Sequence, residues 1–153
     1  MRALLQRVRE ASITVDAERI AAIGPGLVVF LAVGMNDGPE DIAYLVEKVA
    51  GLRIFPDNAG RFDRSARDVD AELLLVSQFT LYADTGKGRR PSFTGAAPPD
   101  AAASLFAQAV EQFRATGLRV ATGRFGAMMQ VALVNDGPVT IWLDSADRHR
   151  PRR

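Results

Sequence analysis

Three polar side chains directly follow an apolar run and are the first candidates for chemistry. Residues 73–76 are four consecutive apolar residues, which predicts a strand buried on both faces, and Ser77, Gln78 and Thr80 come at its end. A buried strand that ends in polar groups holds them against a rigid scaffold, where binding and catalytic groups are common. The alternative is that Ser77 and Thr80 only bond nearby backbone groups and end the strand.

The remaining inventory excludes several mechanisms. His149 is the only histidine and lies in a basic tail, so a Ser-His-Asp triad has no base, and the chain has no cysteine to act as a nucleophile or metal ligand. The pairs Asp57/Asp63 and Asp68/Asp70 could hold Mg²⁺, but they fall in a polar segment typical of solvated surface. We therefore expect no metal and no organic cofactor. Hydroxyl, amide and backbone chemistry is what remains.

A second polar motif stands near the other end of the chain, where residues 134–140 read Val-Asn-Asp-Gly-Pro-Val-Thr. By itself this predicts an ordinary Asp-Gly-Pro turn, since only about 5–6% of X-Pro bonds in folded proteins are cis. Together, Ser-Gln-Phe-Thr-Leu-Tyr at 77–82 and Asn-Asp-Gly-Pro-Val-Thr at 135–140 resemble the D-aminoacyl-tRNA deacylase family. The resemblance extends to about residue 143, with further matching segments at 1–8, 26–34, 52–55 and 123–126.

This resemblance implies a homodimeric enzyme that hydrolyses the ester of D-aminoacyl-tRNA, with its active sites at the subunit interface. It also implies action on glycyl-tRNA mischarged on tRNA(Ala). Such esters are activated, so backbone N–H groups around Phe79 and Thr80 could suffice by orienting the carbonyl and stabilising the oxyanion, with Ser77 and Gln78 holding the loop and the terminal adenosine. Thr80 could be the nucleophile or an orienting group. No base lies near it in sequence, and a ribose hydroxyl of the tRNA could assist instead.

The resemblance assigns chiral selectivity to Gly137 and Pro138. In the family this Gly-Pro bond is cis and reaches into the partner subunit's site, where its carbonyls capture the α-amino group and leave no room for an L side chain. Arg7 matches a family position that supports this gate, and Phe125 and Gly126 match positions beside the site. One position departs from the pattern, because Met128 stands where an acidic residue is common.

A basic loop is the expected contact for the acceptor end of tRNA. Lys87, Arg89 and Arg90 lie in a Gly-containing segment that matches the family in Gly-Arg-Arg-Pro-Ser, although a solvated charged loop is the alternative. Net charge is only +1, which gives no general sign of a nucleic-acid binder. Two rival functions stay open: an RNA- or DNA-binding module without hydrolysis, and a small-ester hydrolase in which Lys87 activates Ser77 or Thr80.

The elements that must position these groups alternate strands with two amphipathic helices. The pattern predicts one domain over 1–145 of class α/β (α+β), with a mixed, mostly antiparallel, barrel-like sheet, two main helices and a disordered basic tail at 146–153. The longest apolar run is 27–33, too short for a membrane span, so we expect no membrane contact. The absence of cysteine is compatible with a reducing cytoplasm, which is the location we expect. Residues 57–70 predict a surface loop that could hold a short hairpin. The expected helices run from Pro39 to Gly51 and from residues 98–100 to Gly117, and the expected strands are 2–8, 11–15, 20–23, 27–33, 73–82, 119–121, 130–134 and 139–143.

Overall fold

The sheet is built around a long first strand, β1 (Arg2–Val15), in a computed structural model that describes residues 1–151. The strand order is β2-β1-β3-β6-β7, and β8 pairs with β1 as well. β1 is antiparallel to β2, β3 and β8, whereas β6 is parallel to both β3 and β7. The other strands of this sheet are β2 (Glu18–Ile23), β3 (Gly26–Ala32), β6 (Glu72–Ser77), β7 (Val120–Thr122) and β8 (Gln130–Asp144).

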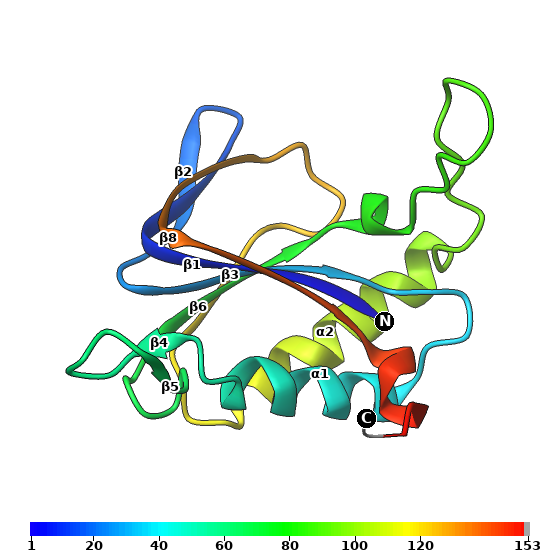
Figure 1. The fold of residues 1–153 in the computed structure, drawn as a ribbon. Coiled ribbons are helices and arrows are strands. Elements are labelled where there is room, and N and C mark those ends of the chain that lie inside the picture. Colours follow the sequence, from blue (N-terminus) through cyan, green and yellow to red (C-terminus); the bar gives the residue numbers. More distant parts are fainter. Residues whose placement is uncertain (152–153) are drawn as a thin grey trace.

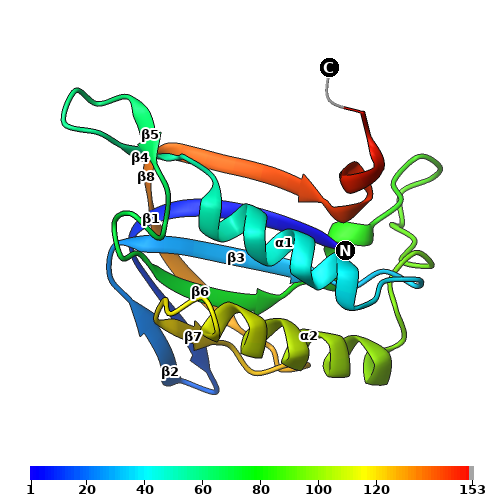
Figure 2. The same cartoon turned by 90° about the horizontal axis from the view of Figure 1, so that it is seen from below.

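Two helices cover one face of the sheet (Figure 1, Figure 2). They are α1 (Pro39–Gly51) and α2 (Pro99–Arg114), and their apolar faces are buried as their spacing predicts. Pro39 occupies the first turn of α1, and the Asp41 carboxylate accepts a bond of 2.9 Å from the Gly38 N–H. The core between helices and sheet includes Leu5, Val29, Leu31, Ile42, Leu45, Val49, Leu75, Phe106, Val110 and Phe113.

The other face of the sheet curls around a second apolar cluster. Its buried members come from several strands and include Val8, Ile13, Ile23, Val28, Leu74 and Val76. Ala127, Met129, Val131 and Leu133 pack on the same cluster, so β8 helps to cover this face. The predicted fold class is therefore confirmed: one α/β domain with two helices and a mixed, nearly closed, barrel-like sheet.

Two predicted strand breaks are wrong. The expected break between strands 2–8 and 11–15 does not interrupt β1, because the exposed residues Arg9 and Glu10 lie where β1 exchanges one neighbour, β3, for another, β2. The expected strands 130–134 and 139–143 are one strand, β8. Its pairing with β1 jumps from Thr140 to Asn135, so the intervening residues bulge out of a continuous ladder instead of ending it.

The central strand is shorter than predicted. β6 ends at Ser77, and a short 3₁₀ helix, η1 (Phe79–Tyr82), replaces the expected strand to residue 82. The Gln78 N–H donates to the Leu31 carbonyl at 2.8 Å, near the end of β3. Neighbouring strand backbone is not available beyond this point, so the chain turns to local hydrogen bonds.

The segment after α1 holds the hairpin that its composition allowed. β4 (Phe55–Pro56) pairs with β5 (Phe62–Arg64) in a separate two-stranded sheet. The predicted disordered tail is wrong for residues 146–149. Ser145–His149 form a second 3₁₀ helix, η2, because Ser145 and Arg148 hydrogen-bond to Asp41 of α1. The tail arginines 152 and 153 lie outside the described residues. Within 1–151, no helix has both the length and the apolar character needed to cross a membrane.

Candidate active site

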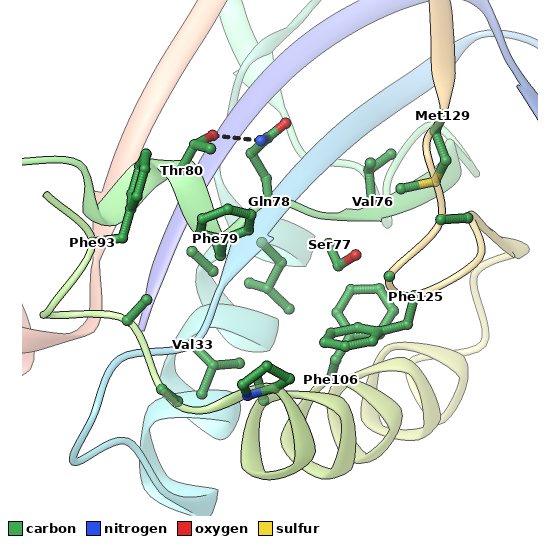
Figure 3. Close-up of a pocket in the computed structure, with 18 of the residues that line it drawn as sticks. Val33, Val76, Ser77, Gln78, Phe79, Thr80, Phe93, Phe106, Phe125 and Met129 are labelled. Carbon is green, nitrogen blue, oxygen red and sulfur yellow. Dashed lines mark hydrogen bonds between the residues drawn. The ribbon is translucent and has the colours of Figure 1, made fainter. Parts of the chain in front are cut away.

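A pocket of about 840 Å³ opens between the end of β6, η1, the start of α2 and the loop before β8 (Figure 3). It brings together two segments that the sequence singled out separately, 77–80 and 125–126. Ser77 points toward Phe125 and Phe106, whereas Gln78 and Thr80 lie together beside Phe79. The remaining lining residues are apolar and include Val33, Val76, Phe93, Ala97, Pro98, Ala102, Met128, Met129 and Val131.

Uncharged groups supply all the polar chemistry of the pocket. Ser77, Gln78 and Thr80 are the only lining side chains that carry a polar N or O atom, and no Asp, Glu, Lys, Arg or His lines it within residues 1–151. The Gln78 amide donates to Thr80 Oγ1 at 2.5 Å. Since that bond uses Thr80 as an acceptor, its own proton stays free to be donated. Because no ionisable side chain within residues 1–151 lines the pocket beside Thr80, no base is present that would make it a nucleophile.

Main-chain donors are available at the start of η1. The N–H groups of Leu81 and Ala83 bond to the Gln78 and Thr80 carbonyls, as expected inside a 3₁₀ turn. The N–H groups of Phe79 and Thr80 begin that turn, and a helix start leaves such donors without an intrahelical acceptor. Neither N–H donates to another group within residues 1–151. Two adjacent donors of this kind at the pocket wall are suited to bind a carbonyl oxygen and the negative charge that develops on it.

Aromatic rings form the mouth of the pocket. Phe79 is 57% exposed and meets Phe93 edge-to-face with 5.0 Å between ring centroids. Phe125 lies 5.9 Å from Phe106, which also lines the wall. Met128, the departure from the family pattern, is 90% exposed at the same mouth. An apolar rim around uncharged donors is suited to a ligand with a flat or apolar group beside a polar one.

Gly137 and Pro138 do not line the pocket of their own chain. They lie in the β8 bulge, joined by a cis peptide bond. Arg7, itself buried, donates to the Asp136 carbonyl at 2.9 Å and to the Ile54 carbonyl at 2.6 Å. Arg7 thus ties the bulge to the segment that follows α1.

Side chains of β8 fix the other side of this bulge. Asn135 Oδ1 accepts from the Val139 N–H at 2.9 Å, and its amide donates to Thr140 Oγ1 at 3.0 Å. Gly137 has a φ of +147°, and a Cβ there would lie 2.9 Å from the Val139 nitrogen. Glycine is required at this position on steric grounds.

The basic loop is also separate from the pocket. Lys87, Arg89 and Arg90 are exposed in a segment closed by paired backbone bonds between Asp84 and Ser92, and none of the three lines the pocket. The loop projects beyond η1 (Figure 1). The small-ester hypothesis, in which Lys87 activates Ser77 or Thr80, has no contact to support it.

Three of the four acidic residues that could have held a metal, Asp57, Asp63 and Asp68, form other bonds. Asp57 accepts from the Arg61 and Ala59 N–H groups, and these bonds, led by the one from Arg61, hold the pKa of Asp57 below its usual range. The pKa of Asp68 is lowered in the same way, first by the Ser65 N–H, and Asp63 pairs with Arg53 at 3.0 Å. Across residues 1–151 no group of three His, Cys, Asp or Glu could hold a metal ion.

Sequence reasoning missed several wall residues. The sequence pattern places Phe106 only on a buried helix face, and Phe93 follows the basic loop with no periodic pattern. Only the fold brings them to the same pocket as Phe79 and Phe125. A signal for Phe93 was available, since an aromatic residue directly after Arg-Arg-Pro-Ser is an unusual feature of a polar loop.

Comparison with known proteins gives one consistent result. The family model described as D-Tyr-tRNA(Tyr) deacylase matches residues 4–144. A D-aminoacyl-tRNA deacylase of Roseiflexus castenholzii is 58% identical over 99% of this chain and 97% of its own. A solved structure described as c-Myc DNA Unwinding Element Binding Protein is 42% identical, with a TM-score of 0.89 over 94% of this chain and 98% of that one. Another, described as a probable eukaryotic D-amino acid tRNA deacylase, has a TM-score of 0.82 over 93% and 97% at 18% identity, which shows the same fold.

Proposed function

The chain belongs to the D-Tyr-tRNA(Tyr) deacylase family, and from this premise and its uncharged pocket we propose that it hydrolyses the ester bond of D-aminoacyl-tRNA. As a member of that family it is a deacylase, a hydrolase of carboxylic esters. The observation that carries the proposal is the meeting of Ser77–Thr80 with Phe125 and Gly126 around one pocket. The 3′ acceptor end of tRNA would enter there with its amino acid attached.

The reaction needs little from ionisable groups. The ester carbonyl oxygen accepts bonds from the N–H groups of Phe79 and Thr80, which stabilise the charge that forms when water adds to the carbonyl carbon. The bond between that carbon and the ribose oxygen then breaks, releasing a free D-amino acid and a tRNA with its hydroxyl restored. A neighbouring ribose hydroxyl can assist the proton transfer. Thr80 and Gln78 position the ester, and Ser77 holds the wall beside the terminal adenosine.

Chiral selectivity is assigned to Gly137 and Pro138 of a partner subunit in a homodimer. These residues do not line their own chain's pocket, so a role in selection requires a second copy. The bulge held by Arg7 would carry its carbonyls into that copy's pocket and bind the α-amino group. A rigid main-chain gate senses only the direction of the side chain from Cα, so it rejects L-residues whatever the side chain.

The same gate predicts that glycyl-tRNA is also a substrate. Glycine has no side chain for the gate to reject, so glycyl-tRNA mischarged on tRNA(Ala) is a second expected substrate. Charged tRNA as the substrate also makes a cytoplasmic location part of the proposal.

The basic loop is proposed to contact the phosphates of the acceptor end. Replacing Lys87, Arg89 and Arg90 together by Ala should weaken binding of uncharged tRNA and flatten its dependence on salt. The slope of log K against log salt should decrease by about 0.7–0.9 for each phosphate that the variant no longer neutralises. An unchanged slope would leave the loop as a solvated surface.

A non-catalytic nucleic-acid-binding module is the second candidate. The observation in its favour is the name of the relative that is 42% identical, the c-Myc DNA Unwinding Element Binding Protein. The near-zero net charge weighs against it, since strong nucleic-acid binders usually carry a marked positive surplus.

One experiment separates these candidates. The purified protein is incubated with D-Tyr-tRNA and, in parallel, with L-Tyr-tRNA, with a chelator present. We expect rapid loss of the D ester alone. Equal loss of both esters would retain the hydrolase but remove the gate assigned to Gly137 and Pro138. Loss of neither, with tRNA still bound, would favour the binding module.

A further inference from the structure

Arg2 lies on the outer face of β1 and reaches the end of η1. Its Nη1 donates to the Leu81 carbonyl at 3.0 Å, and its Nε donates to Asp144 at 3.2 Å. The guanidinium carbon lies 4.4 Å from the ring centroid of Tyr82 and 5.6 Å from that of Trp142. One side chain therefore connects the last strand, the first strand and the 3₁₀ helix that follows β6.

The η1 turn has few attachments of its own. It contains no buried residue and no side-chain cap, and 3₁₀ hydrogen bonds have poorer geometry than those of an α-helix. Its C-terminal end depends on Tyr82, whose hydroxyl donates to Asp37 at 3.3 Å, and on the bond from Arg2 to the Leu81 carbonyl. The Leu81 carbonyl lies in the same short turn whose first peptide units carry the Phe79 and Thr80 N–H groups, so a bond at this carbonyl restrains the turn as a whole.

The contacts of Arg2 are suited to holding the η1 turn in one position. A guanidinium can stack on aromatic faces while its separate N–H groups point to different acceptors, whereas a lysine ammonium cannot do both in a fixed plane. The Arg2 side chain is only 32% exposed, so these contacts are partly shielded from water. The hydroxyl end of Tyr82 packs closely against Gly34, where an added Cβ would lie only 2.5 Å from the Tyr82 hydroxyl.

We propose that Arg2 is a positioning residue for the deacylase site, which acts by fixing η1 so that the Phe79 and Thr80 N–H groups face the ester carbonyl. This inference rests on the proposed function. Arg2 does not line the pocket and touches no reacting group, so its effect passes through the Leu81 carbonyl and the Tyr82 ring. A displacement of about 1 Å at an oriented site can reduce the rate by about 100-fold, so a partial loosening should be visible in kcat.

The test uses Arg2→Met and Arg2→Lys, with Arg67→Met as a matched control. Arg67 also forms an ion pair on the surface, with Glu47 at 2.9 Å, but neither residue lines the pocket or belongs to η1. Amide hydrogen exchange is followed in peptides covering 77–83 and in peptides from α1. Initial rates with D-Tyr-tRNA give kcat and KM for each variant, and thermal unfolding gives Tm.

We expect Arg2→Met to lower kcat about tenfold, with KM changed less than about twofold, and to raise exchange in 79–83 while α1 exchanges as in wild type. Arg2→Lys should be intermediate in both readouts, and Arg67→Met should match wild type. Unchanged exchange in 79–83, or exchange that rises equally in α1, would overturn the proposal by showing no role or a general structural one. If wild type does not hydrolyse D-Tyr-tRNA, the proposed function fails, and the exchange data still decide whether Arg2 holds the turn.

Discussion

At the scale of single residues, the pocket presents donors without a base. Thr80 Oγ1 accepts a bond from the Gln78 amide, and among the pocket residues of the described part of the chain, 1–151, no ionisable group is placed to take its proton. The free N–H groups of Phe79 and Thr80 are then the strongest candidates for stabilising the transition state. The chemistry assigned to this site is accordingly one of orientation, in which side chains hold the ester and the backbone carries the developing charge.

Replacing Thr80 tests this view. We expect Thr80→Ala to lower kcat for D-Tyr-tRNA by no more than about tenfold, because the backbone donors remain. Single-turnover rates with excess enzyme would measure the chemical step directly. Loss of all but a residual rate would indicate a nucleophile instead, since general-base and nucleophilic groups contribute about 10²- to 10⁴-fold or more. Thr94→Ala, at an exposed loop position outside the pocket, serves as the control.

Gly137 provides a second residue-level prediction. A Cβ at this position would lie 2.7 Å from a Val139 methyl group and 2.9 Å from the Val139 nitrogen, and the φ of +147° disfavours any L side chain. Gly137→Ala should destabilise the fold by about 1–3 kcal/mol and greatly lower hydrolysis of D-Tyr-tRNA, because the bulge must shift. Urea unfolding and initial rates check the two effects. A variant with normal activity and D selectivity would exclude the bulge as the gate. Gly38→Ala, where a Cβ meets nothing within 4 Å, is the control.

At the scale of elements, η2 holds the C-terminal segment against α1 through Asp41. One carboxylate oxygen accepts from Ser145 Oγ at 2.6 Å and from Arg148, and the other accepts from the Gly38 N–H. Burial raises the pKa of Asp41, but the hydrogen bonds from Ser145, Gly38 and Arg148 outweigh it and hold the pKa below its usual range. The contact between η2 and α1 therefore depends on the ionised form of Asp41.

The lowered pKa of Asp41 determines how the stability of the fold depends on pH. A carboxyl group with a lowered folded-state pKa contributes stability that is present above the unfolded value, about 3.9, and is lost as pH falls through the folded value. Asp41→Asn should therefore be less stable than wild type at pH 7 and lose less stability between about pH 5 and pH 2. Tm measured across this range tests the sign. Glu40→Gln, whose side chain is 87% exposed and lies 3.9 Å from Arg148, should keep the wild-type profile.

At the scale of the whole molecule, the pocket and the Gly137-Pro138 bulge belong to different parts of one chain. The bulge lies near β4 and β5 through Arg7, which contacts the Ile54 carbonyl and the ring of Phe62. The pocket lies beyond the opposite end of the central strands, where β6 passes into η1. In the proposed homodimer, a site that uses both features would take the pocket from one copy and the bulge from the other.

Mixing two inactive variants tests that assembly. Ser77→Phe should block the pocket but keep the bulge, and Gly137→Ala should disturb the bulge but keep the pocket. After unfolding and refolding together in equal amounts, about half of the dimers are mixed and each holds one intact site, so about a quarter of wild-type activity should return. Each variant refolded alone is the control. Activity no higher than the mean of the two parents would place the whole site within one chain.

The sequence alone determined the fold class, both helices and the two motifs, at 77–82 and 135–140, on which the proposed function rests. Amphipathic periodicity set the buried faces of 39–51 and 99–114, because a helix buries whichever stripe is apolar. The absence of cysteine and the isolation of His149 excluded thiol and triad chemistry from the residue inventory alone. The motif at 77–80 identified the three polar residues of the pocket wall, because these groups directly follow a buried strand.

The tertiary structure decided what depends on partners distant in sequence. The strand breaks expected near Arg9 and near Gly137 lie within continuous strands, because the pairing of β1 with β3, β2 and β8 decides where each strand ends. The strand expected after Ser77 is a 3₁₀ turn, because the neighbouring strands end there. The local sequence cannot show where neighbouring strands end. Only the tertiary structure places Phe93 and Phe106 in the pocket wall and Arg2 against η1. Local pattern fixes which side chains are buried, whereas long-range pairing fixes which of them meet.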